Sequence, residues 1–464
     1  MKLAVFVFAL ATLVPACHGD TKYIGTDCLA TGTGADLQAA IDARKTVLLC
    51  PRAEIVLSQL LVLRQGLTLF TAGLPSDPTE MATIRLGADF PISSSGAVRG
   101  SGSDIHLASV RFDGNRRVLG TQDSQALVEI GPGDGYSIVG CSFTDAPGWT
   151  HLHLIEPCDS SIVTDNVVES ASRPHDAGGH WTDGVSIACS HTTIARNQIH
   201  DPSAVGIVYY GGAGTTISDN VVTLEKTSAF SGINVGDAIV ADHTGVVVSG
   251  NRVTATSPRY LGTGLTAGLH VIGKTTTISG VTLRDNVFEG MARWGLAVDG
   301  CLDCTIAGND ASGWHPLPAL AKCPAPSAYD AAVTVGHASG TIQPGYVDAK
   351  LDGCPGDPEP LGAVYRSYAG DGQLFPEYLA FEVKTYSERV EQKLDAAGLL
   401  KMEWDAIAAR AKTLCPMGTA TDLQLVWRTI VAAQLGDGLA PADADAKAHA
   451  ALMAAPSPAP SCAP

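Results

Sequence analysis

The sequence is poor in charged residues, and basic residues are the scarcer kind. Charged residues make up 17% of the 464 residues, with 30 lysines and arginines against 47 aspartates and glutamates. The formal net charge of −17 argues against nucleic acid as a partner. It also provides no general electrostatic steering toward anionic polymers.

The apolar run at the N-terminus is too short to span a membrane permanently. It extends from Leu3 to Val14, whereas a spanning helix needs about 20 apolar residues. Because the small residues Val14 and Ala16 precede a possible cleavage site, the run indicates a secretory signal peptide over residues 1–17. The segment also resembles a bacterial lipobox ending at Cys17, so we expect membrane contact only if Cys17 is lipidated. In both cases we expect a secreted or envelope-anchored protein in which disulfides form.

Helical periodicity is missing between Val163 and Asn309, and a short phrase recurs there instead. In each copy an aliphatic residue lies three positions before an Asn, and an apolar residue lies two positions after it, reduced to Ala311 in the last copy. The copies follow one another at short and longer intervals, and their Asn residues are Asn166, Asn197, Asn220, Asn251, Asn286 and Asn309. Such a repeat predicts stacked coils of short strands, because no unit buries its apolar face alone.

A second strand phrase, which begins with Gly, precedes the Asn of each later coil. Its first residues are Gly184, Gly206, Gly232, Gly268 and Gly295. Two aligned strand phrases per coil predict a parallel β-helix. We expect each Asn at a left-handed corner, bonded to the Asn of the next coil about 4.8 Å away. The six Asn residues would then form a ladder with a structural role.

The segment before the ladder predicts a short amphipathic helix followed by strands. Leu37, Ala40 and Ile41 form an apolar stripe within residues 34–43, and strands are expected over 46–50 and 53–57. This opening and the ladder resemble the pectin lyase-like superfamily over residues 34–345. The resemblance implies an all-β fold, a right-handed parallel β-helix (solenoid) that the N-terminal helix caps. It also implies a carbohydrate-directed protein, because members include pectate lyases, polygalacturonases, alginate-modifying enzymes and phage tailspikes.

The composition divides the chain into four segments. After the signal segment 1–17 we expect a β-helix domain over 18–374, a small C-terminal α-helical region over 375–438, and a disordered tail over 439–464. Helix-forming residues at near-helical spacing support the third segment. The last one is rich in Ala, Asp and Pro.

The cysteine spacing predicts disulfides and no zinc site. Cys158 and Cys189 each lie eight residues before the Asn of their coil, so they should stack within disulfide reach. Cys28 and Cys50 bracket the N-terminal helix, where a disulfide between them would staple it. Looser pairings are Cys301–Cys304, Cys323–Cys354 and Cys415–Cys462. Because Cys-x-x-Cys does not recur with partner histidines, we expect no metal ligands among them.

Loop lengths indicate a groove over the Gly-strand. The shortest coils end at Asn220 and Asn309, and the excess of the longer coils falls at both ends of this strand. Insertions at both ends would form two walls, which suits an extended polymer. Strand alternation predicts the side chains that face outward into the groove. They are Ser186, Val208, Asn234, His270 and Ala297, and then Ala188, Tyr210, Gly236, Ile272 and Asp299.

The candidate catalytic residues on this groove are Asp183, Asp237, His270, Asp176 and His180. A pair among the three aspartates suits glycoside hydrolysis. His270 or His180, with Lys274 or Arg293, suits β-elimination, in which a base removes a proton and a cation stabilises the enolate. Candidate substrate-binding residues are Asn234, Tyr210, Lys274, Arg293, Trp181 and Asp299. The structural alternatives are a turn cap for Asp183 and a solvated side chain for His270.

The segment Thr182-Asp183-Gly184-Val185 resembles the Asn-Thr-Asp-Gly phrase of polygalacturonase-type hydrolases. The next coil has Asp201 alone where that family has an Asp-Asp pair, and no pectate-lyase calcium cluster is evident. Calcium remains a possible cofactor that would bridge a uronate to the acidic protein.

The sequence therefore predicts a secreted, monomeric carbohydrate-active enzyme that cleaves a polysaccharide as a lyase or a glycoside hydrolase. The alternative is a non-catalytic glycan-binding or adhesin-like surface protein. Polysaccharide is the expected partner in both cases.

Overall fold

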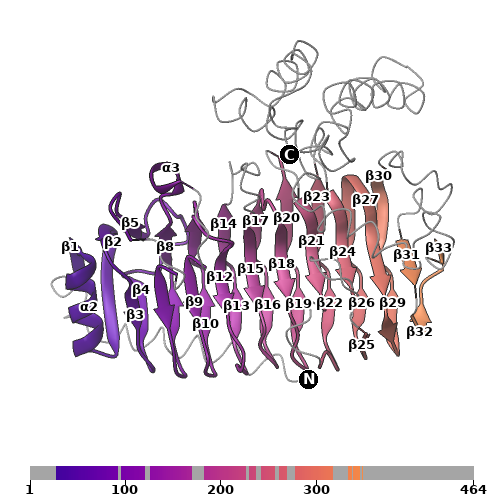
Figure 1. The fold of residues 1–464 in the computed structure, drawn as a ribbon, viewed down its shortest axis with the longest axis horizontal. Helices are drawn as coiled ribbons and strands as arrows, with labels where there is room; N and C mark the ends of the chain where they lie inside the picture. Colours follow the sequence, from indigo (N-terminus) through magenta and orange to yellow (C-terminus); the bar gives the residue numbers. More distant parts are fainter. Residues whose placement is uncertain are drawn as a thin grey trace, which may run out of the picture.

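The chain folds into a long solenoid of parallel strands (Figure 1). The computed structural model describes residues 28–91, 96–120, 126–169, 182–225, 229–236, 242–255, 261–268, 277–316, 333–336, 338–344 and 347–348. The predicted signal segment with Cys17, the C-terminal helical region and the tail lie outside the described residues. Among the described residues, none forms a helix with the length and apolar character that crossing a membrane requires.

Each coil contributes three short strands, and each strand pairs in parallel with its counterpart in the next coil. The first face holds β4 (Thr68–Thr71), β7 (His106–Ala108), β10 (Ser137–Val139), β13 (Ile162–Thr164), β16 (Thr193–Ala195), β19 (Thr216–Ser218), β22 (Val247–Ser249), β26 (Thr282–Arg284), β29 (Cys304–Ala307) and β32 (Gly340–Ile342). The second face holds β5 (Ala82–Leu86), β8 (Val110–Asp113), β11 (Ser142–Thr144), β14 (Val167–Glu169), β17 (Gln198–His200), β20 (Val221–Leu224), β23 (Arg252–Ala255), the start of β27 (Val287–Asp299) and β30 (Asp310–Pro316).

The third face carries the Gly-strands. It holds β3 (Leu61–Leu63), β6 (Val98–Gly100), β9 (Val128–Ile130), β12 (Thr150–Leu154), β15 (Asp183–Ile187), β18 (Val205–Tyr209), β21 (Ala229–Val235), β24 (Leu261–Ala267), the end of β27, β31 (Val333–Gly336) and β33 (Val347–Asp348). β25 (Ile278–Ser279) pairs separately with β28 (Cys301–Leu302). The all-β parallel β-helix is confirmed, with three strands per coil rather than two.

The first coil differs from the others because β2 (Thr46–Leu57) is one continuous strand where two were expected. It pairs with β1 (Leu29–Thr33), β4 and β5. The predicted helix is present as α2 (Gly34–Ala43), with Leu37 and Ile41 buried. The side chain of Gln38 bonds both the N–H and the carbonyl of Val62, so it pairs backbone groups at the edge of β3. A second helix, α3 (Arg116–Leu119), lies between β8 and β9.

The Asn residues form the predicted ladder in the interior of the solenoid. Each Nδ2 group donates to the Oδ1 atom of the next Asn at 2.8–2.9 Å, from Asn166 through Asn309, and Gln343 extends the series. The left-handed residue is the one before each Asn, such as Asp165 and Asp219, and not the Asn itself. This corner divides the segment around each Asn into two strands, one on the first face and one on the second. Together with the Gly-strand they make three strands per coil.

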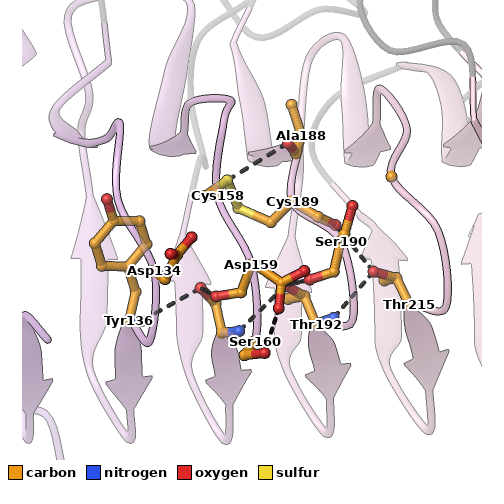
Figure 2. Close-up of a disulfide and its surroundings, with 12 residues drawn as sticks. Asp134, Tyr136, Cys158, Asp159, Ser160, Ala188, Cys189, Ser190, Thr192 and Thr215 are labelled. Atoms are coloured by element: carbon orange, nitrogen blue, oxygen red, sulfur yellow. Dashed lines mark hydrogen bonds between the residues drawn. A yellow bond between two sulfur atoms is a disulfide. The ribbon is translucent and has the colours of Figure 1, made fainter. Parts of the chain in front are cut away.

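The predicted disulfide between Cys158 and Cys189 joins adjacent coils, with 4.6 Å between their Cα atoms (Figure 2). Beside it, the hydroxyl of Thr215 accepts the N–H of Thr192 and donates to the carbonyl of Cys189. The expected Cys28–Cys50 bond is also formed, and so is Cys301–Cys304, whose pairing the spacing left open. Cys323, Cys354, Cys415 and Cys462 lie outside the described residues.

Candidate functional site

The outer surface of the third face is the site that the loop lengths pointed to. Two columns of side chains follow its strands, and the Ser186 hydroxyl, which bonds the side chains of Thr150 and Asp183, shows that they lie on the same side of the sheet. Column A consists of Thr150, Asp183, Val205, Ser231 and Thr263, and column B of Arg99, Glu129, His153, Ser186, Val208, Asn234, Thr266 and Ala297. The residues between them, such as Val185 and Ile207, belong to the hydrophobic core. The predicted direction of Ser186, Val208, Asn234 and Ala297 is therefore confirmed.

The predicted position of His270 beside Asn234 is wrong. Asn234 pairs in register with Thr266, and its Nδ2 group donates to the Thr266 hydroxyl at 2.7 Å. The phrase Gly-Leu-x-apolar occurs twice in succession, beginning at Gly264 and at Gly268, and the earlier copy enters the sheet. Phe288 helps to explain the choice of glycine, because a Cβ atom at Gly264 would lie 2.4 Å from its ring.

Two further expectations about this surface change with the register. The additional residues of the coil after Asn251 fall mainly after the strand, because the strand begins earlier and a longer segment then leads from it to Asn286.

The outward residues were expected to line an open groove, yet Ser186, Asn234 and Thr266 are buried. Strand alternation determines the direction of a side chain, but whether other parts of the chain cover it is a tertiary property.

His153 is the most unusual side chain on this surface. Its residue is 9% exposed, and neither ring nitrogen has a hydrogen-bond partner within the part of the chain that the structure describes. Buried polar groups are nearly always paired, so an unpaired imidazole points to a functional role. Glu129, one coil earlier, approaches it, with 4.0 Å between Oε2 and Nδ1.

Glu129 is itself 4% exposed and would be costly to bury as a lone charge. The half-exposed Arg99, a further coil back, compensates with a contact of 3.1 Å between Nε and Oε1. Column B thus begins with a cation, a carboxylate and an imidazole on three successive strands, β6, β9 and β12.

Two aromatic residues flank the imidazole. The half-buried Trp149, just before β12, meets the ring of His153 edge-on at 4.9 Å between centroids. Tyr210, which directly follows β18, meets it edge-on at 6.2 Å. Aromatic faces stack on the apolar faces of sugar rings, so this pair can hold a glycan over His153.

Column A holds Asp183, whose carboxylate is engaged in the scaffold. One oxygen accepts the N–H of Val205 at 3.0 Å, and the other accepts the Ser186 hydroxyl at 3.3 Å. The same hydroxyl lies 3.0 Å from that of Thr150. Asp183 therefore joins two coils, a structural role that differs from the turn cap expected as its alternative, and it lies next to the His153 column.

A second histidine, His151, points to the interior from the same strand. Its Nδ1–H group donates to the carbonyl of Asp183 at 2.9 Å, and Nε2 accepts the N–H of Ala146 at 3.4 Å. Complete burial lowers its pKa to about 4. His151 is therefore a neutral structural residue at neutral pH.

Arginines gather beside this end of the third face. Arg116, in α3, and its neighbour Arg117 both contact the carboxylate of Asp145, at 3.3 and 3.1 Å. Arg116 is nearly fully buried, and burial lowers its pKa. Asp145 lies four residues before Trp149. The cluster of Arg116, Arg117 and Asp145 thus holds two guanidinium groups against one carboxylate, in a protein that is acidic as a whole.

The structure places three of the predicted site residues with their side chains, namely Asp183, Asn234 and Tyr210. Tyr210 lies beside His153, whereas Asn234 lies two coils farther along column B than Ser186. For Arg293 and Asp299 only the backbone of β27 is described. Asp176, His180, Trp181, Asp237, His270 and Lys274 lie outside the described residues.

Glu129, His153 and Trp149 were missed by the sequence analysis. Their strands, β9 and β12, lack the Gly that marks this face farther along the chain. Val128, Leu152 and Val185 are register partners, so extending the alternation of β15 upstream would have found Glu129 and His153.

Known proteins resemble this chain in fold. The family model described as "Right handed beta helix region" matches residues 92–253. The A-module of Azotobacter vinelandii mannuronan C-5 epimerase AlgE6 is 18% identical, over 68% of this chain and 78% of that one, with a TM-score of 0.46. The exopolygalacturonase of Thermotoga maritima is 12% identical, over 60% of this chain and 84% of that one, with a TM-score of 0.41. The tailspike protein of E. coli bacteriophage HK620 in complex with pentasaccharide is 14% identical, over 67% of this chain and 60% of that one, with a TM-score of 0.42. No curated protein sequence matches the chain. At these identities the likeness concerns the fold alone.

Proposed function

We propose that this chain, whose coils form a right-handed parallel β-helix of the pectin lyase-like superfamily, cleaves a uronate-containing polysaccharide by β-elimination on its third face. The observation that carries the proposal is the His153 imidazole, which is buried beside Glu129 and has both ring nitrogens unpaired within the described part of the chain. A base held in this way is available to remove a proton from a substrate.

Elimination requires a base, an acid and a positive charge. His153 takes the proton from the carbon next to the uronate carboxyl group, and Tyr210, whose ring meets that of His153, donates a proton to the leaving oxygen. Arg99 lies two coils from His153, about 10 Å along column B, and attracts the substrate carboxylate. Trp149 stacks on the sugar ring.

Elimination fits this surface better than glycoside hydrolysis does. Hydrolysis uses two carboxyl groups that are free to act as acid and as base or nucleophile. Of the described carboxylates on this face, Glu129 is paired with Arg99, and Asp183 accepts the N–H of Val205. The local arginines also offset the acidic charge of the whole chain for an anionic substrate.

The remaining predictions enter the proposal as further candidates. Asp176, His180, Asp237 and His270 remain candidate catalytic residues, and Trp181, Lys274, Arg293, Asn234 and Asp299 remain candidate binding residues. We also propose that the protein acts outside the cytoplasm, because its described cysteines form three disulfides.

Polysaccharides with and without uronic acid, assayed with the purified chain, test this function. We expect unsaturated, ultraviolet-absorbing products from a uronate polymer, and a loss of at least about 10²-fold in turnover for His153→Gln. His200→Gln, which changes a histidine on the second face, is the matched control. Unchanged turnover in His153→Gln would reject the assignment of the base.

The second candidate function is glycan binding without cleavage. The aromatic pair Trp149 and Tyr210 favours it, because two half-buried aromatic rings suit a sugar chain without any catalysis. Retention of a polysaccharide by the wild-type chain, with no change in its length or absorbance, would support this function over the enzymatic one.

A further inference from the structure

Column B places three chemically distinct groups on consecutive coils. His153 is the register partner of Glu129 on one side and of Ser186 on the other. Neighbouring strands lie about 4.8 Å apart, and the three side chains point to the same side of the sheet. A carboxylate, an imidazole and a hydroxyl therefore follow one another in a line. This is the order of groups that activates a serine as a nucleophile.

The contacts leave the imidazole ready to serve the hydroxyl. Glu129 lies 4.0 Å from Nδ1 of His153, which leaves Nε2 for the other neighbour. Within the residues described here, neither nitrogen is engaged by any other group. Nε of Arg99 lies 3.1 Å from Oε1 of Glu129, and a carboxylate in this position stabilises an imidazolium.

The Ser186 hydroxyl rests nearby in a polar setting. Its Oγ atom lies 3.0 Å from the hydroxyl of Thr150 and 3.3 Å from a carboxylate oxygen of Asp183. One rotation about χ1 of the serine turns Oγ away from these partners, and catalytic hydrogen bonds commonly tighten only when substrate is bound. Ser231 is the contrasting case, because its register partners Val205 and Thr263 carry no imidazole.

We propose that Ser186 is the nucleophile of a second activity, the hydrolysis of O-acyl esters on the polysaccharide. Ser186 Oγ bonds to the ester carbonyl carbon while His153 takes its proton. The carbon–oxygen bond to the sugar then breaks, and His153 gives the proton to the departing sugar hydroxyl. Water attacks the acyl-serine, His153 accepts a proton from it, and the carboxylic acid leaves as Ser186 recovers its hydrogen. This activity goes beyond chain cleavage and shares with it His153, the Arg99–Glu129 pair beside it and a glycan substrate.

The full-length chain can be tested with 4-nitrophenyl acetate, an O-acetylated uronate polymer and a serine-directed fluorophosphonate. We expect acetate release and covalent labelling of the peptide that carries Ser186. Ser186→Ala should lose both, with at least a 100-fold fall in acetate release. Ser231→Ala, which removes an equally buried hydroxyl from the same face, should keep both.

The outcomes separate this inference from the proposed function. If the wild type cleaves the deacetylated polymer but releases no acetate and takes no label, the ester hydrolysis is rejected while chain cleavage stands. If it releases acetate without cleaving the polymer, the elimination is rejected instead. A label on another residue also overturns the role of Ser186, and this measurement does not depend on the folding of any variant.

Discussion

The carboxylate of Glu129 and the imidazole of His153 lie one coil apart, with 4.0 Å between Oε2 and Nδ1. The two strands that carry them, β9 and β12, are joined in register, so the separation is set by the strand spacing of the solenoid. Arg99, on the next strand, holds the other carboxylate oxygen. The scaffold thus orients a proton-transfer group through its own periodicity.

Replacing Glu129 by Gln should lower kcat by roughly 10²-fold and leave KM nearly unchanged. The carboxylate acts through the imidazole, because it orients His153 and stabilises its protonated form, and it does not bind the sugar. Steady-state kinetics on the uronate polymer measure both constants. Glu169→Gln, which changes an exposed glutamate on the second face, is the control. A rise in KM at constant kcat would contradict the positioning role.

His151 should make the fold less stable in acid. Burial lowers its pKa to about 4, below the value of about 6.5 in an unfolded chain. The unfolded chain therefore binds the proton first as the pH falls, so the contribution is complete above pH 6.5 and is lost toward pH 4. Between pH 7 and pH 5 the free energy of unfolding should fall by about 2 kcal/mol from this group.

Urea unfolding at the two pH values tests this prediction in the wild type and in His151→Asn. The variant should be less stable at pH 7, because it disturbs the bonds to Asp183 and Ala146. Between pH 7 and pH 5, the free energy of unfolding of the variant should fall by about 2 kcal/mol less than that of the wild type. Equal losses in the two proteins would show that His151 titrates normally.

Asn220 should be among the residues that the solenoid tolerates least. Its Nδ2 group donates to Ile194 and to Asn251, and its Oδ1 accepts two bonds from Asn197. Asn220→Leu would leave these buried groups unpaired and should cost about 3 kcal/mol or more. Thermal unfolding measures the loss against Gln198→Ala, an exposed change in the neighbouring coil. A similar melting temperature for the two variants would argue against the ladder as a source of stability.

The Cys158–Cys189 disulfide should stabilise the fold more than Cys301–Cys304 does. The sequence separation of the paired cysteines is 31 in the first and 3 in the second. Because the entropy removed from the unfolded chain grows with loop length, loss of the first bond should cost roughly 3–4 kcal/mol and loss of the second clearly less. Thermal unfolding of the two double Cys→Ser variants compares them. The reverse order would contradict the loop-length argument.

The interior of the solenoid could be predicted from local spacing. Asn166, Asn197 and their successors repeat at distances that only a stack of coils can reconcile, and the structure places their amides in one ladder. Helix α2 begins and ends at the expected residues. Cys158 is bonded to Cys189, as predicted from the equal number of residues between each cysteine and the Asn of its coil. Each of these features repeats a short pattern along the chain, so the sequence alone carries it.

The surface required the tertiary structure. Gly264 and Gly268 begin equivalent phrases, and only the packing against Phe288 and the pairing with Asn234 distinguish them. Glu129, His153 and Ser186 lie on three different coils, with no shared motif around them. Periodicity along the chain therefore determined what lies inside the protein. Which side chains meet on the outside was decided only by the stacking of coils that carry insertions of unequal length. The number of residues in each turn sets the register in which the next strand joins the sheet, and this register brings residues of different coils together.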